Sequence, residues 1–212
     1  MITVVFSDLH GNLPALIKLK NLYPECKNWL SLGDNVNYGP WSNECVQFIE
    51  EEMDCISLLG NHEEYFLAGT YGGENIVART FFDFCYEQFS LQKIISKYTD
   101  CIDIGSYHCS HTIDNKYIFH DTDIVIDRNH LIGHSHQQFF VTKGEFKIIN
   151  PGSLGQNRKY INQADYAVYY NETDTFELKN FIFDLDIVIS EMKNKKYPQI
   201  CIDYYMNKEQ VI

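Results

Sequence analysis

The stretch Leu58-Leu59-Gly60-Asn61-His62-Glu63 joins a short apolar run to three polar residues through a single glycine. Apolar runs of this length that stop at a turn residue are typical of buried β-strands. Such a strand would deliver Asn61 and His62 at its carboxyl end. In open α/β sheets, ligands bind along the edge that is formed by the carboxyl ends of the strands. The stretch therefore predicts a functional site at a strand end.

Three further stretches repeat this arrangement of an apolar strand followed by Asp or His. They are Ser7-Asp8-Leu9-His10 after residues 2–6, Gly33-Asp34 after residues 29–32, and Gly133-His134-Ser135-His136 after residues 131–132. Asp8 and Asp34 are 26 residues apart, and Asp34 and Asn61 are 27 residues apart, which is about one strand–helix unit each. Nitrogen and oxygen donors without cysteine are typical of a site for a hard or borderline divalent metal. We therefore expect the four strand ends to form one metal site.

The first 60 residues alternate strands and helices. Strands are expected at 2–6, 28–32 and 55–59, and Asn12 and Pro14 mark the start of the first intervening helix. This is the βαβ pattern of a parallel sheet. A helical region is expected at 74–98, broken near Ser90, and the strands expected after residue 101 are mostly antiparallel. With no repeat or linker, residues 1–212 are predicted to form a single domain that ends in a helix and tail from about residue 185.

Composition and charge exclude several classes of function. The chain has 212 residues, is 45% hydrophobic and carries a net charge of -12, which argues against binding of duplex nucleic acid or of a membrane surface. Bound metals could still attract phosphate locally. No apolar run is long enough to span a membrane, and the N-terminus enters a strand directly. The seven cysteines are odd in number and form no Cys-x-x-Cys pair, so we interpret them as reduced thiols of a cytoplasmic protein.

Taken together, the motifs resemble the signatures of the calcineurin-like metallophosphoesterase superfamily, especially its small bacterial and archaeal phosphodiesterase-type members, from residue 1 to about residue 184. The matching stretches are residues 7–12, 32–34, 60–63, 133–136 and 150–155. The resemblance implies an α/β fold, a four-layer α/β/β/α sandwich of two mixed sheets flanked by helices. It also implies a hydrolase with two divalent metal ions, Mn²⁺ in the first place, with Fe, Zn, Ni or Mg as alternatives.

The same resemblance implies a role for each site residue. The expected metal ligands are Asp8, His10 and His136 for one ion, Asn61, His111 and His134 for the other, and Asp34 as the bridge between them. His62 matches the histidine that lies beside the phosphate and helps the leaving oxygen to depart. Asp34, Asn61 and His62 are therefore the expected catalytic residues, and Asn61 and His62 are also expected to contact the substrate. Arg158, after the Gly-Ser loop, is a further candidate for substrate binding.

Two features depart from the family pattern. Thr112 follows His111 where the family usually has glycine, and His120 also ends an apolar run, so it is the alternative ligand. We favour His111 because residues 102–111 reproduce the hairpin that precedes this ligand in the family. The loop after Asp34 lacks the Asp-Arg-Gly of protein Ser/Thr phosphatases, which argues against a dedicated phosphoprotein phosphatase.

Elementary chemistry supports the reaction that the resemblance implies. Two divalent ions about 3.5–4 Å apart can acidify a bridging water to hydroxide and clamp the phosphoryl oxygens for in-line attack. Two ions, two aspartates and one hydroxide leave a net positive site that attracts a small phosphorylated substrate. We therefore predict hydrolysis of a small phosphomonoester or phosphodiester. The alternatives are a nuclease of the same superfamily and a non-catalytic scaffold with this fold, and the sequence leaves substrate, native metal and oligomeric state open.

Overall fold

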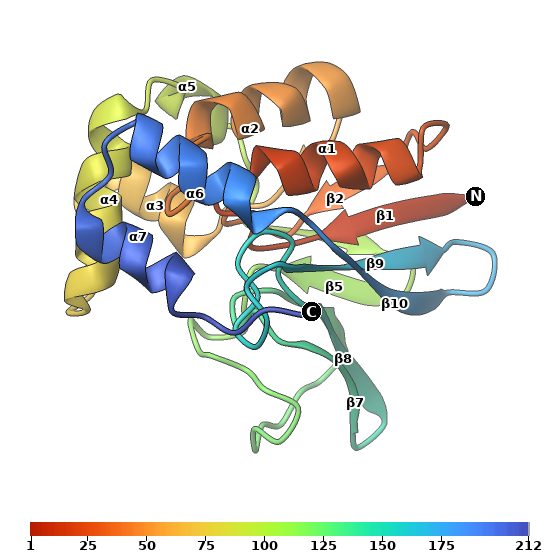
Figure 1. The fold of residues 1–212 in the computed structure, drawn as a ribbon. Coiled ribbons are helices and arrows are strands. Elements are labelled where there is room, and N and C mark those ends of the chain that lie inside the picture. The colour runs from red at the N-terminus through yellow and green to blue at the C-terminus, as the bar shows by residue number, and fades with distance from the viewer. Residues whose placement is uncertain (212) are drawn as a thin grey trace.

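Two five-stranded sheets lie face to face at the centre of the computed structural model, which describes residues 1–211 (Figure 1). The first sheet has the order β10-β9-β1-β2-β3, and its strands are β1 (Ile2–Phe6), β2 (Trp29–Ser31), β3 (Ile56–Ser57), β9 (Gln163–Tyr170) and β10 (Thr175–Ile182). The second has the order β4-β5-β6-β8-β7, and its strands are β4 (Cys101–Ile104), β5 (Tyr107–Ser110), β6 (Asn129–Leu131), β7 (Gln138–Lys143) and β8 (Phe146–Pro151).

Both sheets are mixed, as expected. In the first sheet, β1 pairs in parallel with β2 and β2 with β3, whereas β9 is antiparallel to β1. The expectation that the second half would be mostly antiparallel is too simple, because β6 pairs in parallel with both β5 and β8. β6 has three residues and lies between a long loop and the motif of residues 133–136. A strand this short shows no periodicity from which its parallel pairing could be predicted.

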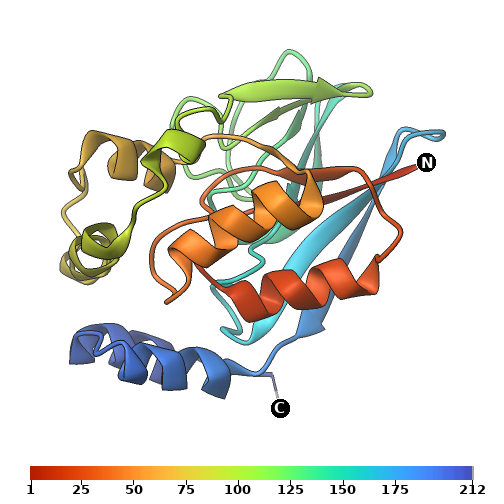
Figure 2. The same ribbon diagram turned by 90° about the horizontal axis from the view of Figure 1, so that it is seen from above.

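The helices flank the first sheet and its carboxyl edge. α1 (Leu13–Leu22), α2 (Ser42–Phe48) with its π-helical extension Ile49–Met53, and α6 (Leu185–Asn194) lie over the outer face of this sheet (Figure 1). The side chain of Asn12 accepts a hydrogen bond from the Ala15 amide and caps α1, as the sequence predicts. Seen from above, α3 (Asn61–Ala68), α4 (Ile76–Gln88) and α5 (Gln92–Ile95) gather to one side (Figure 2).

The tail after Tyr197 contains a helix that the sequence did not reveal. This helix, α7 (Gln199–Met206), begins directly after Pro198 and packs against α4. Tyr205 on α7 is 1% exposed and lies edge-on to Phe81 of α4, with ring centroids 6.0 Å apart. No helix in the described part of the chain has the length and apolar character needed to cross a membrane.

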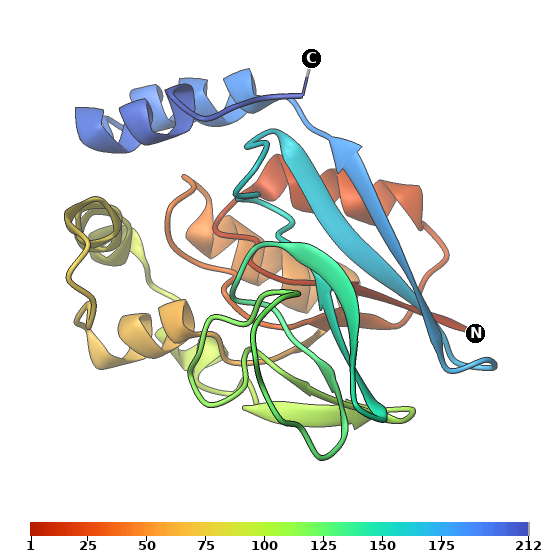
Figure 3. The same ribbon diagram turned by 90° about the horizontal axis from the view of Figure 1, so that it is seen from below.

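An apolar core fills the space between the sheets. The first sheet contributes Val5, Leu30, Leu32 and Leu58, and the second contributes Tyr107, Cys109, Leu131 and Ile149. The outer face of the second sheet is covered differently from the expected helical layer. Within residues 1–211 a loop of residues 112–128 lies there, green beside the β7–β8 hairpin in Figure 3, and its Ile118 is buried against Ile132, Phe139 and Ile148. The sandwich of two flanked sheets is confirmed, with a loop as its fourth layer.

Candidate metal centre

Tight turns at the strand ends direct polar side chains toward one another. Five residues there have left-handed backbone conformations: Asp8 (φ 52°), His10 (φ 47°), Asp34 (φ 57°), His134 (φ 67°) and His136 (φ 57°). A non-glycine residue in this region costs of order 1 kcal/mol or more and persists only when its surroundings hold it. Strain concentrated on these residues indicates that the fold holds their side chains in one arrangement.

Asp8, His10 and His136 form the first group of donors. His10 Nε2 lies 3.2 Å from His136 Nε2, and His136 Nε2 lies 3.3 Å from Asp8 Oδ1. All three side chains are buried, and Asp8 Oδ1 has no hydrogen-bond partner among the described residues. Asp8 Oδ2 accepts a hydrogen bond from the His134 amide at 3.0 Å, which fixes the carboxylate.

A second group forms around His111, which follows β5. His111 Nε2 lies 3.2 Å from each of Asp34 Oδ2, Asn61 Oδ1 and His134 Nδ1. Asp34 also faces the first group, because the same Oδ2 atom lies 4.0 Å from His10 Nε2. Its other oxygen, Oδ1, accepts a hydrogen bond from the His62 amide at 2.8 Å. One carboxylate oxygen is thus shared between two adjacent clusters of donors.

The donor atoms of the first group fit a cation. The Nδ1 atoms of His10 and His136 donate to the carbonyl oxygens of Val36 (3.2 Å) and Gln156 (2.7 Å). In the neutral imidazoles, Nε2 therefore carries a lone pair, and two lone pairs face each other across 3.2 Å. Burial lowers the pKa of His10 to about 3 and that of His136 well below its ordinary value, so both rings are neutral near pH 7. A cation between them would relieve this repulsion and also satisfy Asp8 Oδ1.

The second group is held together electrostatically in the metal-free chain. Burial opposes a charge on His111, but the Asp34 carboxylate outweighs it and raises the pKa of His111 to about 10. Asp34 is the reciprocal case, because burial alone would raise its pKa, whereas His111 and His62 hold it well below its usual value. A proton on His111 thus supplies the positive charge that a bound metal would otherwise supply.

The sequence model described as calcineurin-like phosphoesterase matches residues 1–190. The chain belongs to this family. A protein of Methanocaldococcus jannaschii that bears the name uncharacterised is 28% identical over 232 residues, which cover 92% of this chain and 93% of the relative.

Solved structures share the fold over nearly the whole chain. A metallophosphoesterase from Sphaerobacter thermophilus superposes with a TM-score of 0.78 at 21% identity, covering 97% of this chain and 99% of that one. A hypothetical protein from Pyrococcus horikoshii OT3 gives a TM-score of 0.79 at 15% identity and covers 99% of both chains. Family membership and the buried His/Asp clusters support phosphoester hydrolysis, and the same clusters are suited to binding a divalent metal.

The structure brings six of the seven expected ligands of this calcineurin-like phosphoesterase into two three-residue groups, Asp8-His10-His136 and Asp34-His111-His134, with Asn61 beside the second. His111 takes part, whereas the alternative, His120, is exposed and belongs to neither group. Arg158 is exposed, and its guanidinium carbon lies 5.8 Å from the ring centroid of Tyr117.

His62 is buried at the start of α3, beside both groups. A ring nitrogen of His62 also lies within 4.8 Å of ligand atoms of His10 and Asp34, so these three residues could share a metal ion. The Asn37 amide donates to His62 Nδ1 at 2.9 Å, so neutral His62 carries its proton on Nε2. Burial lowers the pKa of His62, which favours this neutral form.

Three residues at the site were given no role by sequence reasoning. The buried carboxylate of Glu63 accepts hydrogen bonds from the amides of Asp34 (2.7 Å), Asn35 (2.7 Å), Val36 (3.3 Å) and Gly60 (3.0 Å), and so fixes the loop that carries Asp34. Asn37 orients His62, and Tyr117 stacks on His134 with ring centroids 4.0 Å apart. Glu63 could have been recognised, because it belongs to the Gly-Asn-His-Glu motif. Tyr117 carries no such signal.

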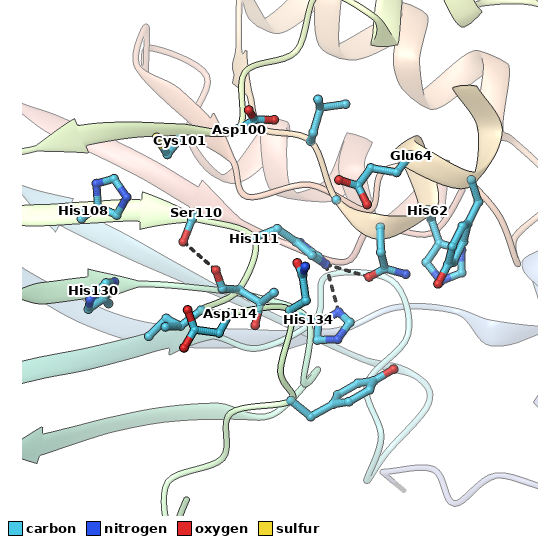
Figure 4. Close-up of a pocket in the computed structure, with 18 of the residues that line it drawn as sticks. His62, Glu64, Asp100, Cys101, His108, Ser110, His111, Asp114, His130 and His134 are labelled. Atoms are coloured by element: carbon cyan, nitrogen blue, oxygen red, sulfur yellow. Dashed lines mark hydrogen bonds between the residues drawn. The ribbon is translucent and has the colours of Figure 1, made fainter. Parts of the chain in front are cut away.

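A cavity of about 750 Å³ opens from the second group along the outer side of the second sheet (Figure 4). Asn61, His62, His111 and His134 form its inner wall. A volume of this size can hold a small organic substrate. A second cavity of about 680 Å³ is bordered by His136 and Arg158.

Proposed function

We propose that this calcineurin-like phosphoesterase hydrolyses small phosphomonoesters or phosphodiesters with two divalent metal ions, most readily Mn²⁺. The observation that carries the proposal is the sharing of Asp34 Oδ2 between two donor groups, 3.2 Å from His111 Nε2 and 4.0 Å from His10 Nε2. A carboxylate oxygen shared in this way is what a dinuclear site requires. The facing lone pairs of His10 and His136 add support, since a cation between them would relieve their repulsion.

In this proposal, Asp8, His10 and His136 would hold one ion, Asn61, His111 and His134 would hold the other, and Asp34 would contribute to both. When bound, two divalent ions provide Lewis acidity at the phosphoryl oxygens and acidify a shared water for in-line attack. The chain supplies orientation, because Val36, Leu32 and Gln156 fix the histidine rings through their carbonyl oxygens. Ring nitrogens fixed in this way lose little entropy on binding metal.

His62 is the residue that acts on the leaving oxygen. With its Nδ1 accepting from Asn37, the Nε2–H is the group available to donate to a phosphoryl or leaving oxygen. Asn61, which precedes it and borders the same cavity, contacts the phosphoryl group beside it. Arg158, on the side of the second cavity, contributes positive charge toward the substrate anion.

Two further expectations complete the proposal. We propose that the chain functions as a single domain, supported by the packing of α6 on the core of the first sheet and of α7 on α4. We propose the cytoplasm as its location, on the ground that all seven cysteines, which lie within residues 1–211, are free thiols.

The test combines metal analysis with hydrolysis assays. Protein stripped with a chelator and reloaded with Mn²⁺ is expected to retain about two ions per chain and to cleave p-nitrophenyl phosphate or bis-p-nitrophenyl phosphate. The His111→Ala variant is expected to lose one ion and most of the activity. The His120→Ala variant is the matched control, because this exposed histidine belongs to neither donor group. A protein that binds two ions but cleaves neither compound would refute the proposed hydrolysis, and one that binds no metal would support a scaffold instead.

A further inference from the structure

The cavity beside the metal centre has an unusual distribution of charge. Three carboxylates border it, those of Glu64, Asp100 and Asp114, and no lysine or arginine does so among the described residues. Asp114 is paired with Lys116 at 3.4 Å, whereas no ion pair or hydrogen bond of the described residues engages the side chains of Glu64 and Asp100. A further phosphate on the leaving group would therefore meet two carboxylates, Glu64 and Asp100, that no cation of the described residues pairs.

Aromatic rings form part of the wall of the same cavity. Tyr65 and Tyr71 lie edge to face with ring centroids 5.1 Å apart, and Tyr117 stacks on the ligand candidate His134. Tyrosine rings offer flat apolar faces together with polar edges, which suits a planar ring system that also forms hydrogen bonds. The wall is therefore suited to a ring and not to a flexible polyanion.

The far end of the cavity lies on the outer face of the second sheet, where β5 contributes His108 and Ser110 and β6 contributes His130 (Figure 4). His130 is 8% exposed, and its Nδ1 has no hydrogen-bond partner among the described residues. A buried polar nitrogen without a partner is costly, and a ligand group that bonds to it recovers that free energy. His130 Nδ1 is an observation separate from the carboxylates. It indicates that the far end of the cavity can bind a neutral polar group of the substrate through a hydrogen bond.

Two cationic side chains border the second cavity, and one of them, Arg158, also lies 5.8 Å from the ring centroid of Tyr117, which borders the first. Arg158 and Lys159 border the second cavity together with His136, whereas His62 borders only the first. Because His62 is the proposed donor to the leaving oxygen, the leaving group departs into the first cavity. A charged leaving group in that cavity would meet the carboxylates of Glu64, Asp100 and Asp114 in its wall, whereas Arg158 borders the second cavity.

We infer that the enzyme selects phosphoesters whose leaving group is an uncharged, ring-bearing alcohol of about nucleoside size, and rejects leaving groups that carry further phosphates. The inference rests on the proposed function, since it concerns the direction in which the leaving group departs. Water attacks phosphorus, the P–O bond to the alcohol breaks, and His62 Nε2–H assists the departing oxygen, so that the products are phosphate and the neutral alcohol.

Adenosine phosphates test this inference with one nucleoside and three leaving groups. Removal of the terminal phosphoryl group from AMP, ADP and ATP releases adenosine, AMP and ADP, whose negative charge increases in that order. Phosphoanhydrides are intrinsically the more reactive, so chemistry alone would favour ADP and ATP. We expect instead that the Mn²⁺-loaded enzyme has a kcat/KM for AMP about tenfold or more above that for ADP, because like charges at short range repel.

Variants that replace the cavity carboxylates with amides test whether charge repulsion causes the preference for AMP over ADP. The double variant Glu64→Gln/Asp100→Asn is expected to raise kcat/KM for ADP relative to AMP by about threefold or more. Glu145→Gln is the matched control, since this exposed carboxylate lies in the β7–β8 turn outside the cavity and should leave the ratio unchanged. An enzyme that cleaves the nitrophenyl compounds but not AMP, or cleaves ADP at least as well as AMP, overturns the inference while the proposed function stands. An equal shift of the ratio in the control overturns it as well, and failure to cleave any of these compounds overturns the proposed function itself.

Discussion

Replacing Glu63 with glutamine removes the charge that holds the loop of Asp34. In the native protein Oε2 accepts from the amides of Asp34 and Gly60, and Oε1 accepts from those of Asn35 and Val36. Glutamine is nearly isosteric but presents an NH₂ group in place of one oxygen. Whichever way the amide turns, two backbone N–H groups lose their acceptor and face another donor. Glu63 is 0% exposed, so water cannot replace the lost acceptor.

The magnitude follows from those two donors. A buried donor left without a partner costs about 1–3 kcal/mol, so Glu63→Gln should lower the free energy of unfolding by about 2–6 kcal/mol. This is a large fraction of the about 5–15 kcal/mol by which single domains are stable. The same change should weaken metal binding, because the loop that carries Asp34 loses its main support.

Urea denaturation of chelator-treated protein measures the effect without linkage to metal. Burial and the charge of Asp34 raise the pKa of Glu63 to about 7, so pH 8 keeps the native carboxylate ionised. Glu64→Gln is the matched control for stability, since this neighbouring residue is exposed and should change the free energy of unfolding by less than about 0.5 kcal/mol. Equal unfolding midpoints for the two variants would refute the role assigned to Glu63.

Three other predictions follow from the site. Asn37→Ala frees His62 Nδ1 and should lower kcat about tenfold with little change in KM; a kcat within twofold of the native value would contradict the role of Asn37 in holding the tautomer. In Gly60→Ala the new Cβ would overlap Asp34 Oδ1 and its backbone nitrogen, so we expect a loss of about 1–3 kcal/mol and weaker metal retention. Gly144→Ala, a turn residue at φ 64° with open space around it, is the control, and its cost should stay near 1 kcal/mol without loss of metal. The pKa of His111 is raised to about 10, so in metal-free protein the folded state keeps a proton that the unfolded state releases above about pH 6.5. The free energy of unfolding should therefore fall as pH rises, by about 2 kcal/mol between pH 7 and 8.5. His111→Phe should remove most of this slope in urea titrations, and an unchanged slope would exclude His111 as its source.

The sequence by itself determined the family, the strand ends that carry Asp8, His10, Asp34, Asn61, His134 and His136, and the helix that Asn12 caps. These features are local, because an apolar run, a turn residue and a donor occur within a few positions of one another. Only the tertiary structure decided that Glu63 supports the loop of Asp34, that Tyr117 stacks on His134, and that a loop covers the second sheet. It also decided that His130, an ordinary strand residue in the sequence, ends in the cavity beside the metal centre with a nitrogen that no described residue pairs. Contacts of this kind join residues far apart in the chain, and no periodicity of a single segment records which distant side chain will lie opposite.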